Sequence, residues 1–187
     1  MTTRLATLLF LVAALAGAAR ADSGRALDLD ELIDLSTEIV VGEVVSSTSR
    51  WQRRLVVTDT VVRVDEAMKG GPEREVTITQ PGGTAVHPGL GAPVTTQAST
   101  FTALDAGETV ILFVERRARI RTLVGAQQGK LTVAPAAKAG GPRELAVGPK
   151  KLRPEPGAPH GTIGTRGMTV DELRARIAAR RDARGPR

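Results

Sequence analysis

The sequence predicts a mainly β domain: a small closed or partly closed barrel of five to six strands, with a short N-terminal helix and a C-terminal helix. Three observations predict this fold class. Short runs rich in Val, Thr, Ile and Leu alternate with turns that contain glycine or proline, and a helix-capping pattern both precedes the first run and follows the last. Short strands joined by tight turns favour closure, because a barrel leaves no exposed sheet edge.

The predicted strands are rich in β-branched residues, which favour sheets. They comprise residues 39–45, 54–65, 75–80, 109–114, 120–124 and 131–133. In the longest, Val56 and Val62 lie on the face opposite Asp59, which indicates one buried and one solvated side. The run 109–114 is apolar throughout, so we expect a central strand there. Gly42, inside the first strand, indicates a bend or bulge.

Both helices are predicted from capping boxes. Asp28 is the expected N-cap of a helix over 27–35, with Glu31 at the third helical position. Thr169 and Glu172 repeat the pattern at the start of the C-terminal helix. That helix carries a thin apolar stripe made of Val170, Leu173 and Ile177. The stripe favours packing against the barrel over insertion into an anionic membrane.

The chain is expected to divide into four parts. Residues 135–168 are rich in proline and glycine, which predicts a linker. The parts are a signal peptide at 1–21, an OB-like β-barrel domain at 22–134, this linker, and a basic C-terminal helix and tail at 169–187. Residues 150–187 hold 10 Lys/Arg against 4 Asp/Glu, so the excess positive charge lies in the tail, where a solvated extension is the usual explanation.

The N-terminus has the features of a cleavable export signal. Arg4 supplies the positive charge, and residues 5–16 form an apolar run too short to span a membrane. Ala19 and Ala21 place small residues at −3 and −1, which predicts cleavage between Ala21 and Asp22. We therefore expect an exported protein, periplasmic or extracellular, with no transmembrane span. The chain has no cysteine, which excludes disulfides, thiol catalysis and thiolate metal sites.

The order of the predicted strands resembles that of a known group of modules. The residues that carry it are the strand at 36–45 (STEIVVGEVV), residues 58–64, Met-Lys-Gly at 68–70, and GETVILF at 107–113. Over residues 36–134 the chain resembles netrin-like modules, the OB-type barrels of netrins, complement components and tissue inhibitors of metalloproteinases, and also uncharacterised exported bacterial proteins of the same strand order. The resemblance implies an OB-like barrel with a terminal helix.

One departure limits what the resemblance implies about function. Netrin-like modules begin with a cysteine, and the protease inhibitors among them use it to ligate the protease metal. This chain has no cysteine, so neither that mechanism nor any functional residue of the family is carried over.

The candidate binding residues lie between the first two strands. Trp51 stands among Arg50, Arg53 and Arg54. An exposed aromatic residue beside arginines is typical of a contact site, and we assign binding to Trp51, Arg53 and Arg54. The alternative is that Trp51 caps the end of the barrel.

Catalytic and metal-binding patterns are scarce. His87 and His160 are the two histidines, and neither belongs to an H-x-x-x-H, H-E-x-x-H or G-x-S-x-G motif. We assign no catalytic residue, no metal ligand and no cofactor. The long segment 81–104, predicted to be a loop, supports an alternative in which a hydrolase or metal-dependent enzyme uses His87.

A nucleic-acid site is not expected. An OB-type groove stacks bases on aromatic side chains, and the chain has one Trp, three Phe and no Tyr. An arginine cluster follows the apolar strand and is interpreted as edge protection at a turn. It consists of Arg116, Arg117, Arg119 and Arg121.

The function predicted is therefore an exported, non-enzymatic binding or interaction module. Its partner is expected to be another exported protein or an extracellular ligand. A third hypothesis is a structural partner that docks through the arginine-rich C-terminal helix.

Overall fold

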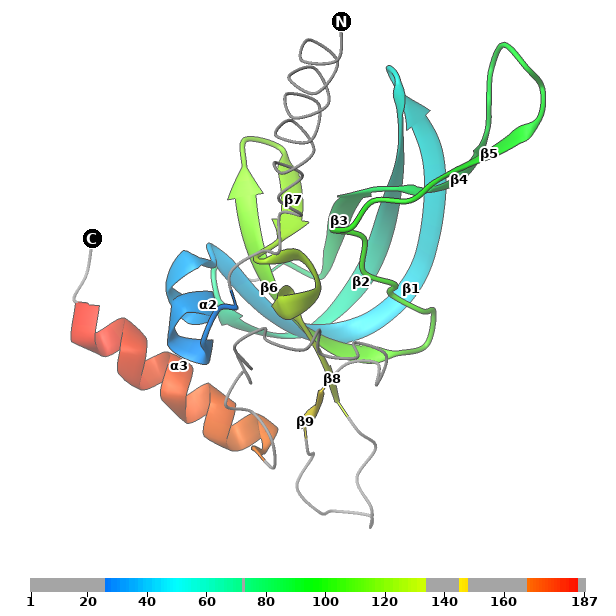
Figure 1. Ribbon diagram of the computed structural model, residues 1–187. Coiled ribbons are helices and arrows are strands. Elements are labelled where there is room, and N and C mark those ends of the chain that lie inside the picture. The colour runs from blue at the N-terminus through cyan, green and yellow to red at the C-terminus, as the bar shows by residue number, and fades with distance from the viewer. Residues whose placement is uncertain (1–25, 72, 134–144, 148–167, 185–187) are drawn as a thin grey trace, which may run out of the picture.

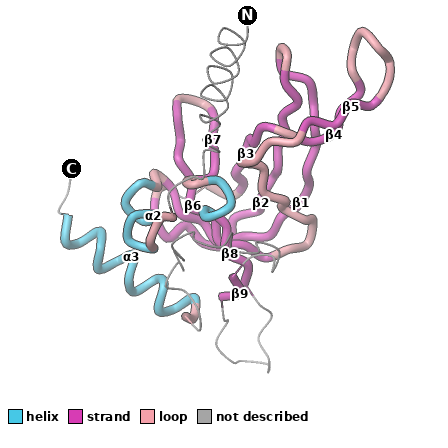
Figure 2. The backbone as a smooth tube through the Cα atoms, viewed as in Figure 1, coloured by secondary structure: helices cyan, strands magenta, loops and turns pink. Residues whose placement is uncertain are grey.

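The computed structural model describes residues 26–71, 73–133, 145–147 and 168–184 (Figure 1). Its elements are α2 (Leu29–Leu35), β1 (Glu38–Gln52), β2 (Leu55–Lys69), β3 (Glu75–Pro81), β4 (Gly83–Val86), β5 (Pro93–Thr96), β6 (Thr109–Arg117), β7 (Ile120–Leu123), the 3-10 helix η2 (Ala126–Gly129), β8 (Lys130–Val133), β9 (Leu145–Val147) and α3 (Val170–Arg184). Strands dominate the tube view, which confirms the mainly β prediction (Figure 2).

Several predictions fall on other residues. The expected signal peptide with its Ala21–Asp22 cleavage site and His160 lie outside the described residues, and so does all of the predicted linker except the short β9 and residue 168. In the part of the chain that is described, no helix has the length and apolar character needed to cross a membrane.

The main sheet is antiparallel and strongly curved, but it is not a closed barrel. Six strands follow one another in the order β3-β2-β1-β6-β8-β9, and β7 pairs with the far half of β6. The curvature brings β3 beside β7. No ladder of backbone hydrogen bonds joins these two strands among the described residues, so of the two predicted forms, closed and partly closed, the closed barrel is wrong.

The physical reason is that β6 branches. Its first half pairs with β8 and its second half with β7. Strand β7 is therefore one arm of a short hairpin and does not run the full length of a barrel wall. A side chain joins β3 to the segment that precedes β6. The amide of Gln80 accepts from the backbone N–H of Thr102 and donates to its carbonyl, both at 2.9 Å.

Strands β1 and β2 form a hairpin longer than the sequence indicated. Their register runs from Ile39 opposite Lys69 to Gln52 opposite Leu55. Residues 46–52 of β1 extend beyond the predicted strand 39–45, because serines, a threonine and an arginine there lack the apolar pattern of a strand. The predicted irregularity at Gly42 is confirmed by a register shift between Val41 and Gly42. A Cβ at Gly42 would lie 2.2 Å from the carbonyl oxygen of Arg63, so a side chain does not fit there.

The segment 81–104 is not simply a loop. It contains the hairpin of β4 and β5, which extends away from the main sheet (Figure 1). Its residues are mostly threonine, alanine, proline and glycine, whose low hydrophobicity hid the strands. At the other end of the fold, residues 145–147 of the predicted linker form the short strand β9, which pairs with β8.

Two hydrophobic cores lie on opposite faces of the sheet. The first is enclosed by the curve of the sheet and includes Val44, Ile78 and Leu112. The second lies between the sheet and the helices α2 and α3, with Phe113 from β6 at its sheet side. This apolar burial from both faces confirms that residues 109–114 form a central strand.

Helix α3 belongs to the second core. The predicted capping box is present, since the backbone N–H of Glu172 donates to the hydroxyl of Thr169 and the Glu172 carboxylate accepts from the N–H of Thr169. Leu173 and Ile177 are buried in the core that α3 shares with α2 and the sheet. The packing of this helix on the domain is therefore confirmed.

Candidate binding surface at the hairpin ends

Trp51 and His87 are in contact. The sequence placed Trp51 in the binding hypothesis and His87 in the alternative enzyme hypothesis. Trp51 is the penultimate residue of β1, and His87 directly follows β4. Their rings meet edge to face, with centroids 4.7 Å apart and an angle of 78° between planes. Aromatic contacts of this kind contribute about 0.5–1.5 kcal/mol beyond the area that they bury. The contact therefore joins the end of the β1–β2 hairpin to the end of the β4–β5 hairpin.

Two glycines bring these hairpins together. Gly82 and Gly83 both have left-handed backbone conformations, with φ of 111° and 116°. A Cβ on Gly83 would lie 2.3 Å from the hydroxyl of Thr58 and 2.4 Å from that of Ser49. The Thr58 hydroxyl also donates to the Gly82 carbonyl at 2.8 Å. Glycine lets the backbone run directly over β1 and β2, and this path carries His87 to Trp51.

His87 also holds its own hairpin end. Its Nδ1 accepts hydrogen bonds from the backbone N–H groups of Gly89 and Leu90, at 3.0 and 3.1 Å. Its carbonyl accepts from the N–H of Gly91 at 2.9 Å. Within the described residues, no group of three or more His, Cys, Asp or Glu side chains is arranged to hold a metal ion.

Trp51 is half-buried, and its indole N–H is enclosed without a hydrogen-bond partner among the described residues. A buried donor left unpaired costs about 1–3 kcal/mol. The position therefore carries an energetic cost that an aromatic residue without the N–H would avoid.

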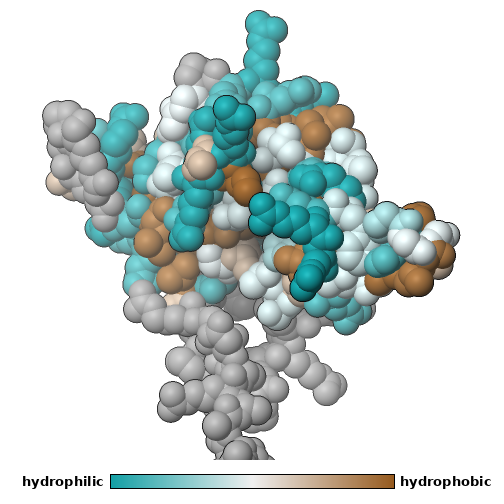
Figure 3. Space-filling model, turned by 90° about the horizontal axis from the view of Figure 1, so that it is seen from above, coloured by the Kyte–Doolittle hydropathy of each residue, from teal (hydrophilic) through white to brown (hydrophobic). Residues whose placement is uncertain are grey.

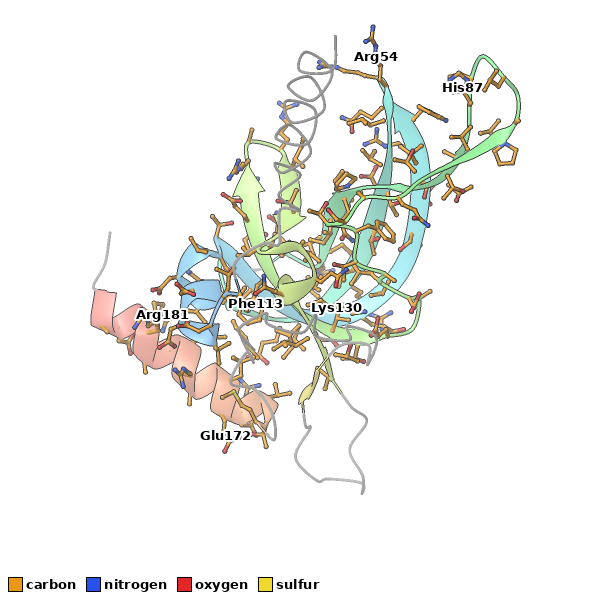
Figure 4. The ribbon with its side chains drawn as sticks, viewed as in Figure 1. Arg54, His87, Phe113, Lys130, Glu172 and Arg181 are labelled. Carbon is orange, nitrogen blue, oxygen red and sulfur yellow. The ribbon has the colours of Figure 1, made fainter. Side chains whose placement is uncertain are left out.

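The arginines next to Trp51 divide into two kinds. Arg50 pairs with Asp59 at 2.6 Å, and Asp59 also accepts from Thr79, so this arginine ties β1 to β2 and β3. Arg53 and Arg54 form the two-residue turn between β1 and β2, are exposed, and have no ion pair with any described residue. Figure 4 shows the Arg54 side chain projecting from the end of this hairpin.

Arg53 has a left-handed backbone conformation, with φ of 58°. This conformation costs a non-glycine residue about 1–2 kcal/mol. Stability alone would therefore favour glycine at this turn. The presence of an arginine there points to a role for its charged side chain.

Exposed apolar side chains accompany the arginines. Leu55, Val86 and Leu90 are 58%, 61% and 70% exposed. Figure 3 looks down on this side of the molecule and shows hydrophobic surface at the end of the protruding hairpin, with further hydrophobic patches among hydrophilic residues. We call the combined surface the hairpin-end face, and it consists of Trp51, Arg53, Arg54, Leu55, Val86, His87 and Leu90.

The cluster of four arginines around the β6–β7 turn also divides. Arg121 is largely buried and bonds Glu38 at 2.7 Å and Glu73 at 2.5 Å, and Arg116 lies 3.4 Å from Glu38. Hydrogen bonding to Glu38 raises the pKa of Arg121 despite its partial burial. These two arginines hold β6 and β7 to the start of β1, which differs from the exposed edge protection expected.

The arginines of α3 are also engaged. Arg174 bonds both oxygens of Glu66 at 2.7 Å, and Arg180 bonds both oxygens of Asp34 at 3.1 and 2.6 Å. Arg176 bonds Asp30 at 2.8 Å. These pairs face the domain, so the basic helix uses much of its charge to attach to α2 and β2.

One small pocket lies at the seam between β3 and β7. Its volume is about 180 Å³, and no charged side chain lines it. The lining residues are Thr79, Gln80, Pro81, Thr100, Thr122, Leu123 and Ala126. Hydroxyl and amide groups without an acid or base can bind a ligand but supply no proton-transfer group.

The sequence identified Trp51, Arg53 and Arg54, and the structure places them on one surface. The sequence did not identify Leu55, Val86 and Leu90, because the pattern around an isolated apolar residue in a strand or turn does not show whether its side chain is exposed. Comparison of the chain with protein-family models, curated proteins and solved structures finds no match.

Proposed function

We propose that this protein is an exported, non-enzymatic binding module that contacts its partner through the hairpin-end face. The observation that carries the proposal is the Trp51–His87 contact, which holds two hairpin ends together. Around it lie arginines without acidic partners among the described residues and apolar side chains exposed to solvent. Arginine and tryptophan are enriched among the residues that dominate binding energy in interfaces.

The position of His87 favours binding over catalysis. Its Nδ1 accepts hydrogen bonds from two backbone N–H groups of the same turn, so the neutral ring carries its hydrogen on Nε2 and has no free lone pair. A general base needs a free nitrogen directed at a substrate, and a metal ligand needs further ligands beside it. The contacts of His87 instead maintain the shape of the hairpin end.

The test compares what the exported protein retains with and without this face. The variant Arg53→Gln/Arg54→Gln/Leu90→Ser removes two charges and one apolar side chain, all exposed, so the fold is expected to persist. The matched control Arg74→Gln/Arg181→Gln/Leu35→Ser makes the same chemical changes on exposed residues of other elements. Each protein is immobilised and incubated with the exported fraction, and retained species are identified by mass spectrometry.

A species retained by the wild type and by the control, but lost with the face variant, supports the proposal. Equal retention by the two variants contradicts it, and so does a wild type that retains neither protein nor lipid. Export is tested by the mass of the purified exported protein, which is expected to begin at Asp22.

A further inference from the structure

We propose that the partner of the hairpin-end face is a membrane surface of anionic lipids, which the protein touches peripherally. This inference rests on the proposed function and names the partner. It adds a third hairpin, β6–β7, whose end points to the same side of the molecule as the ends of β1–β2 and β4–β5 (Figure 1).

The first argument is charge. The three hairpin ends are residues 52–55, 86–93 and 117–120, with sequences QRRL, VHPGLGAP and RARI. Together they hold four arginines and no aspartate or glutamate. Elsewhere in the fold, arginines are typically paired with carboxylates. Here Arg53, Arg54 and Arg119 have no ion pair with a described residue, and Arg117 pairs with Glu115 while its side chain remains 80% exposed. The side thus presents positive charge that an anionic surface complements.

The second argument is the place of the apolar side chains. Leu55, Leu90 and Ile120, one at the end of each hairpin, are 58%, 70% and 47% exposed. Projecting apolar side chains flanked by arginines fit an interface in which the apolar groups enter the acyl boundary while the guanidinium groups remain among headgroups. Separate hairpin ends need no continuous complementary surface, because lipids move to surround each one.

The third argument concerns Trp51. Its indole is half-buried behind these ends, and its N–H lacks a partner among the described residues. Tryptophan is enriched at the membrane–water interface, where the ring contacts apolar groups and the N–H finds acceptors. A headgroup oxygen would supply the acceptor after a small movement of the hairpin end.

The chain supplies its own probe, because Trp51 is its single tryptophan. The purified exported protein is titrated with vesicles of phosphatidylcholine mixed with phosphatidylglycerol, and with vesicles of phosphatidylcholine alone. We expect a blue shift of Trp51 emission with the anionic vesicles only, weakened by high salt. Lipids brominated near the headgroup are expected to quench Trp51 more than lipids brominated deep in the acyl chain.

Variants assign the binding to this face. Each arginine near an anionic surface changes partitioning about fivefold, so Arg53→Gln/Arg54→Gln is expected to weaken it about 25-fold. Leu90→Ser is expected to weaken it about tenfold. The controls Arg74→Gln/Arg181→Gln and Leu35→Ser are expected to bind like the wild type. Because all these side chains are exposed, the thermal unfolding of each variant is expected to match that of the wild type. The quenching measurements use the wild type alone, so they test the inference even if a variant fails to fold.

The outcomes separate this inference from the proposed function. No binding to anionic vesicles, equal binding to neutral ones, or equal losses in face and control variants would overturn the lipid inference. If vesicles are not bound but a retained species still depends on the hairpin-end face, the partner is not lipid and the proposed function stands. If neither vesicles nor any retained species depends on the face, both fail.

Discussion

The rings of Trp51 and His87 meet edge to face at the ends of two hairpins that belong to different sheets. The contact is the point at which the β4–β5 hairpin is fixed against the end of β1. Its loss therefore has consequences that can be measured at both hairpins.

His87→Ala is expected to loosen the end of the β4–β5 hairpin with little effect on the rest. The substitution removes the ring contact and the acceptor of the Gly89 and Leu90 N–H groups. We expect faster hydrogen exchange at Leu90 and Gly91 and a loss of global stability of about 1 kcal/mol or less. Unchanged exchange at these amides would show that the histidine does not hold the turn.

Gly83→Ala is expected to displace the whole hairpin. The new Cβ would approach the hydroxyls of Thr58 and Ser49 to within 2.4 Å, at a φ that disfavours side chains. We expect Trp51 emission to change as His87 moves away, together with a destabilisation of about 1–3 kcal/mol. Gly71→Ala is the control, since a Cβ there meets nothing within 4 Å. Similar spectra for the two variants would argue against this role of Gly83.

Lys130→Met is expected to be among the most destabilising single changes outside the apolar cores. The ammonium group of Lys130 is buried, bonds Glu108 at 2.6 Å and donates to the carbonyl of Ala103 at 2.8 Å. Removing one partner of a buried pair leaves the other charge unpaired, which costs about 3–5 kcal/mol. Urea unfolding measures the loss. Adding Glu108→Gln should recover part of it, and no recovery would contradict the ion-pair explanation.

Leu173→Ala is expected to test the attachment of α3. Leu173 is fully buried in the core that α3 shares with α2 and the sheet, so truncation should cost about 2–5 kcal/mol. Arg181→Gln, at an exposed position of the same helix, should change stability by less than about 0.5 kcal/mol. Equal midpoints in thermal unfolding for the two variants would show that α3 does not contribute to the core.

Acidification is expected to weaken the attachment of α3, because it protonates the carboxylates that pair with the arginines of this helix. Hydrogen bonds from Arg176 and Arg174 lower the pKa values of Asp30 and Glu66 below their ordinary values of 3.8 and 4.5, against the opposing effect of partial burial. A lowered folded-state pKa stabilises the fold above the unfolded-state pKa, and this contribution is lost as the pH falls through the folded-state value.

Thermal unfolding should therefore be insensitive to pH down to about pH 5, and stability should fall below that. Glu108 contributes in the same direction: burial raises its pKa, but hydrogen bonds from Lys130 and Thr132 outweigh burial and lower it. Glu66→Gln should reduce the dependence on pH between about pH 5 and pH 3. A variant with the full acid dependence of the wild type would contradict the contribution of Glu66.

Local chemistry determined the elements of this fold. The capping boxes at Asp28 and Thr169 depend on residues three apart, and the structure confirms both. The apolar stripe of α3 and the irregularity at Gly42 were likewise visible in the sequence, since periodicity and side-chain size act over a few residues.

Tertiary structure alone decided how these elements meet. The curvature that leaves β3 beside β7 without a ladder depends on the branching of β6, which no local pattern records. The pairing of the α3 arginines with carboxylates of α2 and β2 depends on contacts such as Arg180 with Asp34, which are far apart in the sequence. The meeting of Trp51 and His87 depends on the path that Gly83 allows across Thr58, because that path sets the direction of a hairpin. Side-chain chemistry specifies what each position can do, and the long-range packing of the chain specifies which positions do it together.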